Sequence, residues 1–207
     1  MSPDLELIGR RSSHYTRVVR MLALELDLPL RLSPIMDLMS RDAAVFAGNP
    51  ALKLPILRVD GESVFGTGNI CRVLARRAGA EHRVFWPEQA DTPLLLNAHE
   101  LLAHAMAAQV EVVMHEIVAK RPPDVVSVKR REGLVASLAW LDRHLDAILA
   151  ALPDDRLRWF DITLHCLLEH IPFRNPIDLD GYPALTAFSR DFAQRASAQA
   201  TPYGFDA

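Results

Sequence analysis

The sequence predicts a small α/β domain followed by an all-helical domain. Up to residue 80, short apolar strands alternate with amphipathic helices. After residue 92, apolar residues recur only at helical spacing. Residues 81–91 lie between the two patterns and include Phe85-Trp86-Pro87, which is typical of a linker with apolar anchors. We therefore predict domains at residues 1–80 and 92–207, joined by a linker at 81–91.

The first domain is predicted to hold four strands. Strands are expected at residues 5–8, 30–32, 54–59 and 62–65, and helices at residues 15–26, 40–46 and 67–78. Ser40 is the expected cap of the short middle helix. Asp60-Gly61 indicates a tight hairpin between the last two strands, because both residues tolerate positive φ. Alternation that ends in one hairpin predicts a mixed sheet with helices on its faces.

The second domain is predicted to be a bundle of helices. They are expected at residues 94–117, 134–152, 160–171 and 183–193. Pro122-Pro123 is expected to end the first of these helices, and Pro172 the third, because proline cannot donate the helical hydrogen bond. Leu94-Leu95-Leu96 places apolar side chains on more than one face of the first helix, which predicts a two-fold homodimer.

The composition excludes several classes of protein. Half of the 207 residues are hydrophobic and 24% are charged, which is ordinary for a globular chain and excludes global disorder. The net charge of −3 lacks the basic surplus of a nucleic-acid-binding protein. Cys71 and Cys166 are far apart, and the eight histidines lack ligand spacing, so neither a disulfide scaffold nor a metal site is expected. Both cysteines are expected in the core.

We expect this chain in the cytoplasm. No apolar stretch is expected to reach the roughly 18 residues of a membrane span, and no signal peptide is evident, so no membrane partner is predicted. Two widely separated cysteines are also compatible with a reducing compartment.

Three segments carry groups that suit an anionic ligand. Ser12 and Ser13 precede the first helix, where unpaired backbone N–H groups and the helix dipole stabilise an anion such as a thiolate. The alternative is that one of these serines only caps the helix. Thr67 follows Gly66 at the start of another helix and suits a carboxylate, although it too is an ordinary helix cap.

The third segment is Lys53-Leu54-Pro55, at the start of a strand. Proline there suits a strand edge or a cis peptide bond. A cis bond would turn the backbone of Leu54 outward, where it would pair with an extended ligand as an added strand does. The alternative is a plain strand start beside a solvated lysine.

Taken in order, these segments resemble the glutathione S-transferase superfamily over nearly the whole chain. Residues 13–20, Ser-His-Tyr-Thr-Arg-Val-Val-Arg, are similar to the serine-type first-helix motif of bacterial members. Lys53-Leu54-Pro55 resembles the family's Lys-Val-Pro loop with its cis proline. Further similarities are the hairpin at Asp60-Gly61, the segment at Thr67 and Ile70, the linker Phe85-Trp86-Pro87, the start of a core helix at Trp159-Phe160-Asp161-Ile162, and the tail Ala200-Thr201-Pro202.

The resemblance implies a thioredoxin-like domain, an all-helical domain and a homodimer. It also implies glutathione as cosubstrate, whose thiolate attacks a small hydrophobic or electrophilic substrate. Ser13 matches the position whose hydroxyl donates to the thiolate, and Leu54 matches the one whose backbone binds the cysteinyl part. Lys53 is implied to meet the glycine carboxylate of glutathione, and Thr67 the γ-glutamyl carboxylate.

The sequence departs from the family pattern at several positions. Gly66 stands where glutamate or glutamine is usual, which removes an acceptor for the γ-glutamyl ammonium. Leu52 stands where glycine is common, and Arg158 where a capping serine or threonine is usual. His14 replaces a frequent proline or cysteine and is expected at the surface.

A second-substrate pocket is expected between the loop before the first helix and a helix of the second domain. Arg10 and Arg11 in that loop are candidates to accept an anion. The candidate lining residues are Arg10, Arg11, Ser12, His14, His99, Leu102 and Met106.

Two classes of function therefore remain open from the sequence. The first is an enzyme that conjugates, isomerises or reduces a substrate with glutathione, including a narrow isomerase or dehalogenase. The second is a non-catalytic binding or dimerisation module on the same fold, which Gly66 favours because glutathione affinity would fall.

Overall fold

The chain forms two compact units in the computed structural model, which describes residues 5–174 and 177–206. The first unit consists of Met1–His82 together with Arg195–Ala207, and the second of Arg83–Gln194. The segment from Arg195 onward, which the sequence pattern assigned to the helical domain, therefore groups with the α/β unit.

The first unit is built on a mixed sheet of four strands in the order β2-β1-β3-β4. The strands are β1 (Glu6–Gly9), β2 (Arg31–Pro34), β3 (Ile56–Val59) and β4 (Glu62–Phe65). β1 pairs parallel with β2 and antiparallel with β3, and β3 pairs antiparallel with β4. This arrangement confirms the predicted mixed sheet.

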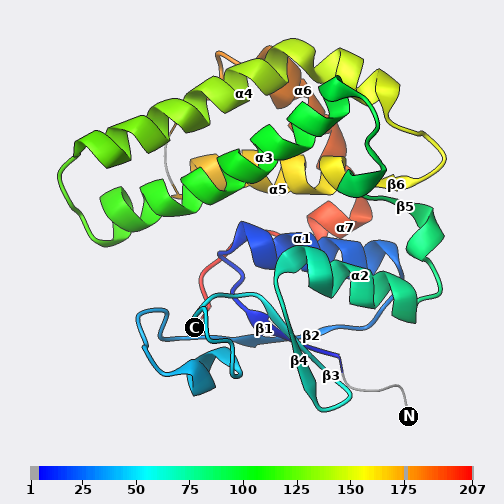
Figure 1. Ribbon diagram of the computed structural model, residues 1–207, viewed down its shortest axis with the longest axis vertical. Helices are drawn as coiled ribbons and strands as arrows, with labels where there is room; N and C mark the ends of the chain where they lie inside the picture. Colours follow the sequence, from blue (N-terminus) through cyan, green and yellow to red (C-terminus); the bar gives the residue numbers. More distant parts are fainter. Residues whose placement is uncertain (1–4, 175–176, 207) are drawn as a thin grey trace. The chain divides into compact units, whose positions relative to one another are not determined.

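Two helices lie side by side on the same side of this sheet, α1 (His14–Glu25) and α2 (Thr67–Arg77) (Figure 1). Side chains alternate between the faces of a strand, so neighbouring residues of β1 are buried on opposite faces. Ile8 of β1 and Ile56 of β3 pack in one cluster with Phe46, from the 3₁₀ helix η1 (Ala43–Phe46). Leu7 and its partner Leu57 are fully buried on the other face.

The cap of η1 differs from the prediction. Asp42, not Ser40, precedes the helix and accepts the backbone N–H of Ala44 through Oδ1 at 2.9 Å. Ser40 instead accepts the N–H of Asp42 at 3.2 Å. A carboxylate next to the first turn reaches the unpaired N–H groups that a serine two residues earlier does not.

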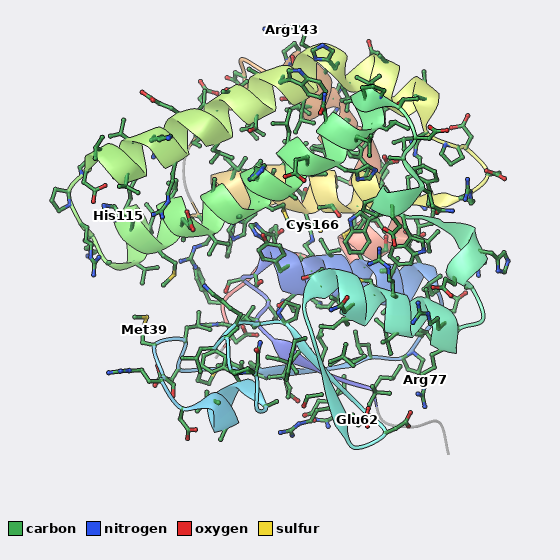
Figure 2. All side chains as sticks on the ribbon, viewed as in Figure 1. Met39, Glu62, Arg77, His115, Arg143 and Cys166 are labelled. Carbon is green, nitrogen blue, oxygen red and sulfur yellow. The ribbon has the colours of Figure 1, made fainter. Side chains whose placement is uncertain are left out.

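The hairpin between β3 and β4 turns at Asp60 and Gly61, both with positive φ (52° and 84°), which confirms the predicted tight turn. The Asp60 carboxylate also accepts two hydrogen bonds from the Arg77 guanidinium, at 2.6 and 3.1 Å. Figure 2 shows Arg77 at the end of α2 and Glu62 at the start of β4.

The second unit is helical apart from two short strands. Its elements are η2 (Glu81–Arg83, which begins in the first unit), β5 (Val84–Phe85), η3 (Pro87–Gln89), α3 (Pro93–Val112), the π-helical turn η4 (Val113–Val118), α4 (Val125–Ala151), β6 (Leu157–Arg158), α5 (Trp159–Arg174) and α6 (Pro183–Phe192). The four predicted helices are confirmed. α4 starts at Val125, well before the predicted residue 134, because the Asp124 carboxylate accepts the N–H groups of Val126 and Ser127.

The predicted linker is structured. Val84 and Phe85 form a short strand parallel to β6. The Arg156 guanidinium lies 5.0 Å from the ring centre of Phe85, and Trp86 lies 5.5 Å from Trp159, centre to centre. The apolar anchors of the linker thus tie it to the start of α5.

Helix α5 is the centre of the second unit, with almost every side chain from Phe160 to Ile171 buried. Cys166 lies on this helix (Figure 2), and both cysteines are fully buried, as predicted. Pro172 does not end α5, which continues to Arg174. Proline lacks the N–H that would donate to a carbonyl of the preceding turn, so Pro172 costs the helix one hydrogen bond without ending it there.

The run Pro93–Val118, which is α3 and η4 together, is long and apolar enough to cross a membrane, since a stretch of 18 residues within it has a mean hydropathy of 1.3. The expectation that no stretch reaches this length is therefore wrong. The same composition occurs in core helices of globular proteins, and the buried residues of α3, such as Leu95, Ala98 and Leu102, belong to a helix that packs on α4 and α5. This feature is weak evidence for a membrane span.

Candidate active site

The three candidate segments meet at one end of the sheet. Ile8, Ile56 and Phe65 are neighbours across β1, β3 and β4. The chain leaves β1 and β4 just beyond this row, and it enters β3 just before it. The loop to Ser13, the segment Lys53–Pro55 and the turn at Gly66 therefore share this edge, although they are far apart in the sequence.

Ser13 is the N-cap of α1. Its backbone is extended, with φ −100° and ψ 125°, and its Oγ accepts the N–H of Thr16 at 3.2 Å. The capping interpretation of the sequence is therefore confirmed. A hydroxyl has two lone pairs and one hydrogen. Capping uses a lone pair, and within the described part of the chain the Ser13 O–H donates no hydrogen bond, so its hydrogen remains available to a ligand.

A glycine lets the loop before Ser13 pass close to α1. A Cβ at Gly9 would lie 2.5 Å from Oγ1 of Thr16. The same Oγ1 accepts the N–H of Arg10 at 3.3 Å, and the C=O of Arg10 accepts the N–H of Ser13 at 3.1 Å. The first turn of α1 holds no acidic residue, so its positive end is not neutralised from within the helix.

The anion predicted at Arg10 and Arg11 is supplied by the chain itself. Oδ2 of Asp206 accepts the backbone N–H of Arg11 at 3.0 Å and lies 3.6 Å from Nε of Arg10. The Asp206 side chain is only 5% exposed. Sequence reasoning missed Asp206, because no local pattern links it to residues almost 200 positions earlier.

His14 is not a surface residue. It is 1% exposed, and its ring meets the Tyr15 ring edge-on at 4.5 Å between centres. The expectation failed because His14 is the first residue of α1 and faces inward next to Thr16 and Arg17, which are also buried. A ring with this exposure is part of the core of the unit and does not line an open surface.

The Leu54–Pro55 peptide bond is cis, as predicted. Asn49 braces the segment from inside, since its Nδ2 donates to the C=O of Lys53 at 2.8 Å and its Oδ1 accepts the N–H of Ala51 at 3.0 Å. Leu52 has φ +53°, which explains why glycine suits that position.

The backbone of Leu54 is open to a ligand. Among the described residues, its N–H and C=O make no hydrogen bond, and its side chain is half-buried. The side chain of Lys53 is exposed. An extended peptide placed along this segment would find one donor and one acceptor on Leu54, the pairing used when a strand is added to a sheet edge.

The turn at Gly66 leads into α2. Gly66 has φ +85° and ψ 133°, a conformation that side chains disfavour, and it is the N-cap of α2, without a side-chain hydrogen bond. The interpretation of Thr67 as an ordinary helix cap is therefore wrong, because Thr67 lies one position inside the helix. The first atom that a Cβ there would meet is Nδ2 of Asn69, at 3.9 Å. Thr67 follows as the half-buried first residue of α2, where helix N–H groups and a hydroxyl face the same end.

The pocket residues expected from the second unit divide into two kinds. Leu102 and Met106 are 2% and 1% exposed and belong to the core of α3, so they offer little surface to a substrate. His99 is half-buried, and its ring meets Phe160 edge-on at 5.6 Å between centres. Burial lowers the pKa of His99 to about 4, against the opposing attraction of the Glu88 carboxylate, so the imidazole is neutral near pH 7.

Arg158, which departs from the family pattern, does not replace the capping serine or threonine, because a guanidinium only donates hydrogen bonds. Its Nε donates to Oδ2 of Asp161 at 2.7 Å, and its Nη1 donates to the C=O of Leu149 at 3.3 Å. The guanidinium thereby ties the start of α5 to the end of α4. Among the residues that the structure describes, no three His, Cys, Asp or Glu side chains are grouped to hold a metal ion.

Part of the sequence matches a known protein family, and the fold matches many solved structures. Residues 7–82 match the family model described as glutathione S-transferase, N-terminal domain. No curated protein matches the sequence. Many solved structures are similar over nearly the whole chain.

Several of these structures contain glutathione or a derivative. A glutathione transferase family member from Pseudomonas fluorescens Pf-5, with bound glutathione, is 26% identical with a TM-score of 0.73, covering 97% of this chain and all of that one. A glutathione S-transferase from Methylobacillus flagellatus KT, with glutathione bound, is 21% identical with a TM-score of 0.75 and the same coverage. One from Methylobacterium radiotolerans JCM 2831, in complex with glutathione sulfonate, is 22% identical with a TM-score of 0.76, covering 99% of this chain and 97% of that one.

The order of strands and helices in the first unit, the helical second unit and these matches agree with one another. The chain therefore has the glutathione S-transferase fold, a thioredoxin-like domain followed by an all-helical domain, and its residues 7–82 match the N-terminal domain of glutathione S-transferases.

Proposed function

We propose that this protein is a glutathione-dependent enzyme that activates the glutathione thiol for attack on a small electrophile. The observation that carries the proposal is the shared sheet edge, where a capping serine, an unpaired strand-like backbone and a helix N-terminus come together in a glutathione S-transferase N-terminal domain. Each group suits a different part of one extended, anionic tripeptide.

Ser13 is the proposed activating residue. Its O–H donates to the glutathione sulfur while its oxygen continues to accept the Thr16 N–H. Both this donor and the positive end of α1 favour the charged form of the sulfur, so the pKa of the bound thiol falls. The thiolate then forms a bond to the electrophilic atom of the substrate, whose leaving group departs with the electron pair or whose double bond takes it up.

The remaining contacts hold the tripeptide. Leu54 pairs its backbone N–H and C=O with the cysteinyl residue, and the exposed Lys53 meets the glycine carboxylate. The Thr67 hydroxyl and the first N–H groups of α2 bind the γ-glutamyl carboxylate. The outcome depends on the electrophile: displacement gives a conjugate, and addition followed by release of the thiolate gives an isomer. Where a second glutathione thiolate attacks the sulfur of the conjugate, the carbon–sulfur bond breaks, the substrate leaves reduced, and the two glutathiones leave oxidised as a disulfide.

The test is binding and turnover with matched variants. Titration calorimetry with glutathione should give a measurable affinity for the wild type, and a panel of electrophiles should give at least one turned-over substrate. Ser13→Ala should lose turnover more than affinity, whereas Ser12→Ala serves as the neighbouring control. Turnover that is unaffected by Ser13→Ala and lost in Ser12→Ala would assign the role to Ser12 instead.

One observation favours the second candidate, a non-catalytic binding module. Gly66 has no side chain to accept the γ-glutamyl ammonium, and the space beside it is open out to Asn69. A module of this kind would neither be retained on immobilised glutathione nor turn over any electrophile. Retention of the wild type on such a resin, with elution by free glutathione, decides against it.

We also propose that the protein is a two-fold homodimer. Leu96 on α3 is 51% exposed, and Val125 and Val126 at the start of α4 are 83% and 50% exposed. Apolar side chains in such number on neighbouring helices are typical of an interface. Light scattering at micromolar concentration should give twice the mass of the chain, and Leu96→Glu should give the mass of one.

A further inference from the structure

The segment after α7 (Ala196–Gln199) returns to the N-terminal end of α1. Figure 1 shows this part of the chain, in red, running from α7 past the start of α1. It belongs to the same compact unit as the sheet and α1. Its contacts fall on both sides of Ser13, one set on the helix after it and one on the loop before it.

The first set of contacts surrounds Arg17, one helical turn after Ser13. Arg17 is only 2% exposed, and its N–H bonds to the C=O of Ser13 at 3.0 Å. Its guanidinium donates to the C=O of Ala198 and to Oγ1 of Thr201, both at 3.4 Å, and lies 4.5 Å from the ring centre of Tyr203. A buried guanidinium needs such partners, because an unpaired charge in the interior is costly.

The second set of contacts joins Asp206 to the loop. Its carboxylate accepts the backbone N–H of Arg11 and faces Nε of Arg10. Gly204 lies against the Arg11 guanidinium, since a Cβ there would be 3.6 Å from its Cζ. Because the Asp206 side chain is almost fully buried, this carboxylate is held in one place.

A short chain of hydrogen bonds connects Asp206 to the Ser13 hydroxyl. The Asp206 carboxylate accepts a hydrogen bond from the backbone N–H of Arg11, and the C=O of the neighbouring Arg10 accepts one from the N–H of Ser13. Thr16 closes the ring, because its Oγ1 accepts from Arg10 and its N–H donates to Oγ of Ser13. The position of the Arg10–Arg11 backbone thus sets the position of Ser13.

We propose that Asp206 is a positioning residue for the Ser13 hydroxyl, acting through the backbone of Arg11. This inference rests on the proposed role of Ser13 in activating the glutathione thiol. Misplacing a group by about 1 Å can cost on the order of 100-fold in rate, so a tether that removes smaller displacements has a measurable effect.

The experiment distinguishes two effects of Asp206: its hydrogen bond to the backbone of Arg11 and its negative charge. Asp206→Ala removes the acceptor of the Arg11 N–H, whereas Asp206→Asn keeps an oxygen there and removes only the charge. Asp191→Ala is the control, since Asp191 is an exposed carboxylate that also faces an arginine, Arg190, at 3.8 Å. Three quantities are measured in each variant: amide hydrogen exchange of residues 10–13 without ligand, the pKa of the thiol of bound glutathione from its thiolate absorbance, and turnover.

Asp206→Ala should speed exchange of the Arg11 amide, raise the thiol pKa and lower turnover by about 5- to 20-fold. Asp206→Asn and Asp191→Ala should stay within about twofold of the wild type in turnover, since neither loses the oxygen on Arg11. If Asp206→Ala does not fold, Asp206→Ser replaces it, because a serine side chain is too short to reach the Arg11 N–H.

Two results would overturn the proposal. One is unchanged exchange of residues 10–13 in Asp206→Ala. The other is an equal fall of the thiol pKa in Asp206→Ala and Asp206→Asn, which would mean that the carboxylate acts only as a negative charge beside the thiolate. Failure of the proposed function shows separately, as a thiol pKa that Ser13→Ala leaves unchanged.

Discussion

The N–H of Thr16 donates to Oγ of Ser13 at 3.2 Å, so the oxygen that caps α1 belongs to the same hydroxyl that is proposed to activate glutathione. The two roles use different parts of the group. Capping uses a lone pair, and activation uses the hydrogen. Variants that separate the two are therefore available.

Ser13→Ala removes both roles, Ser13→Asp keeps the cap without a donor, and Ser13→Thr keeps both. A hydrogen bond to a charged group contributes roughly 1.5–3 kcal/mol. Ser13→Ala should therefore lower turnover at neutral pH by about 10- to 150-fold, at tenfold per 1.36 kcal/mol. The loss should shrink as pH rises, because hydroxide then ionises the thiol without help.

In the same series, Ser13→Asp should remain as stable as the wild type and lack turnover, and Ser13→Thr should keep most of it. Stability is measured by thermal unfolding and turnover by pH-dependent kinetics on an accepted electrophile. Wild-type turnover in Ser13→Ala at every pH would leave Ser13 as a helix cap alone.

Thr67→Ala should weaken glutathione binding and leave turnover at saturation nearly unchanged. Its proposed carboxylate contact is equally present in the ground state and the transition state, so its loss raises KM without lowering kcat. We expect a rise of about 5- to 20-fold in KM for glutathione, corresponding to one partly exposed hydrogen bond. Thr67→Ser, which keeps the hydroxyl, is the control, and a fall in kcat rather than a rise in KM would contradict the assignment.

Gly66→Ala should destabilise the first unit although there is room for the methyl group. The nearest atom would lie 3.9 Å away, so the cost comes only from φ +85° and ψ 133°. Such a conformation costs an ordinary residue about 1–3 kcal/mol. Gly68→Ala is the matched control, because Gly68 lies within α2 at an ordinary φ, where alanine favours the helix. A Cβ there would lie 3.3 Å from Nη1 of Arg72, at the end of a flexible side chain that has only to shift slightly. Urea unfolding of both variants measures the difference, and equal stabilities would contradict the strain argument.

His99 should make the protein less stable as pH falls. Its folded pKa of about 4 lies below the ordinary value of 6.5, because burial disfavours the charged ring. Between these two pKa values, His99 is protonated in the unfolded chain and neutral in the folded one. The free energy of unfolding therefore falls progressively as pH falls from 6.5 towards 4. After a discount for the partly exposed ring, the loss is about 1–2 kcal/mol.

The matching measurement is denaturant unfolding of the wild type and His99→Gln at several pH values in this window. The variant should lose part of the pH dependence, because glutamine does not titrate. His104→Gln, at an exposed position of the same helix, is the control. An identical pH dependence in wild type and His99→Gln would show that the ring titrates normally.

Local patterns were enough to predict most of the secondary structure. The strands, the Asp60-Gly61 turn and the cap at Ser13 depend on residues within a few positions of each other, where side-chain period and φ preference act directly. The cis bond before Pro55 was predicted from a local motif as well. The exceptions, such as the cap of η1 at Asp42, are choices between neighbouring polar residues that offer similar local bonds.

Contacts between residues that are distant in the sequence could be learned only from the packed structure. His14 and Arg17 are buried because other elements pack on α1. From the sequence alone, a histidine and an arginine in the first turn of a helix are equally compatible with an exposed helix end. The carboxylate that accepts the backbone N–H of Arg11 belongs to Asp206. Leu102 and Met106, which were expected to line a substrate pocket, are buried in the core of the helical unit. Local residue patterns were sufficient to predict the helices and strands and the chemical groups available at the sheet edge. Packing decided which charges are paired and which side chains remain free to act, because those depend on contacts between segments that no local spacing encodes.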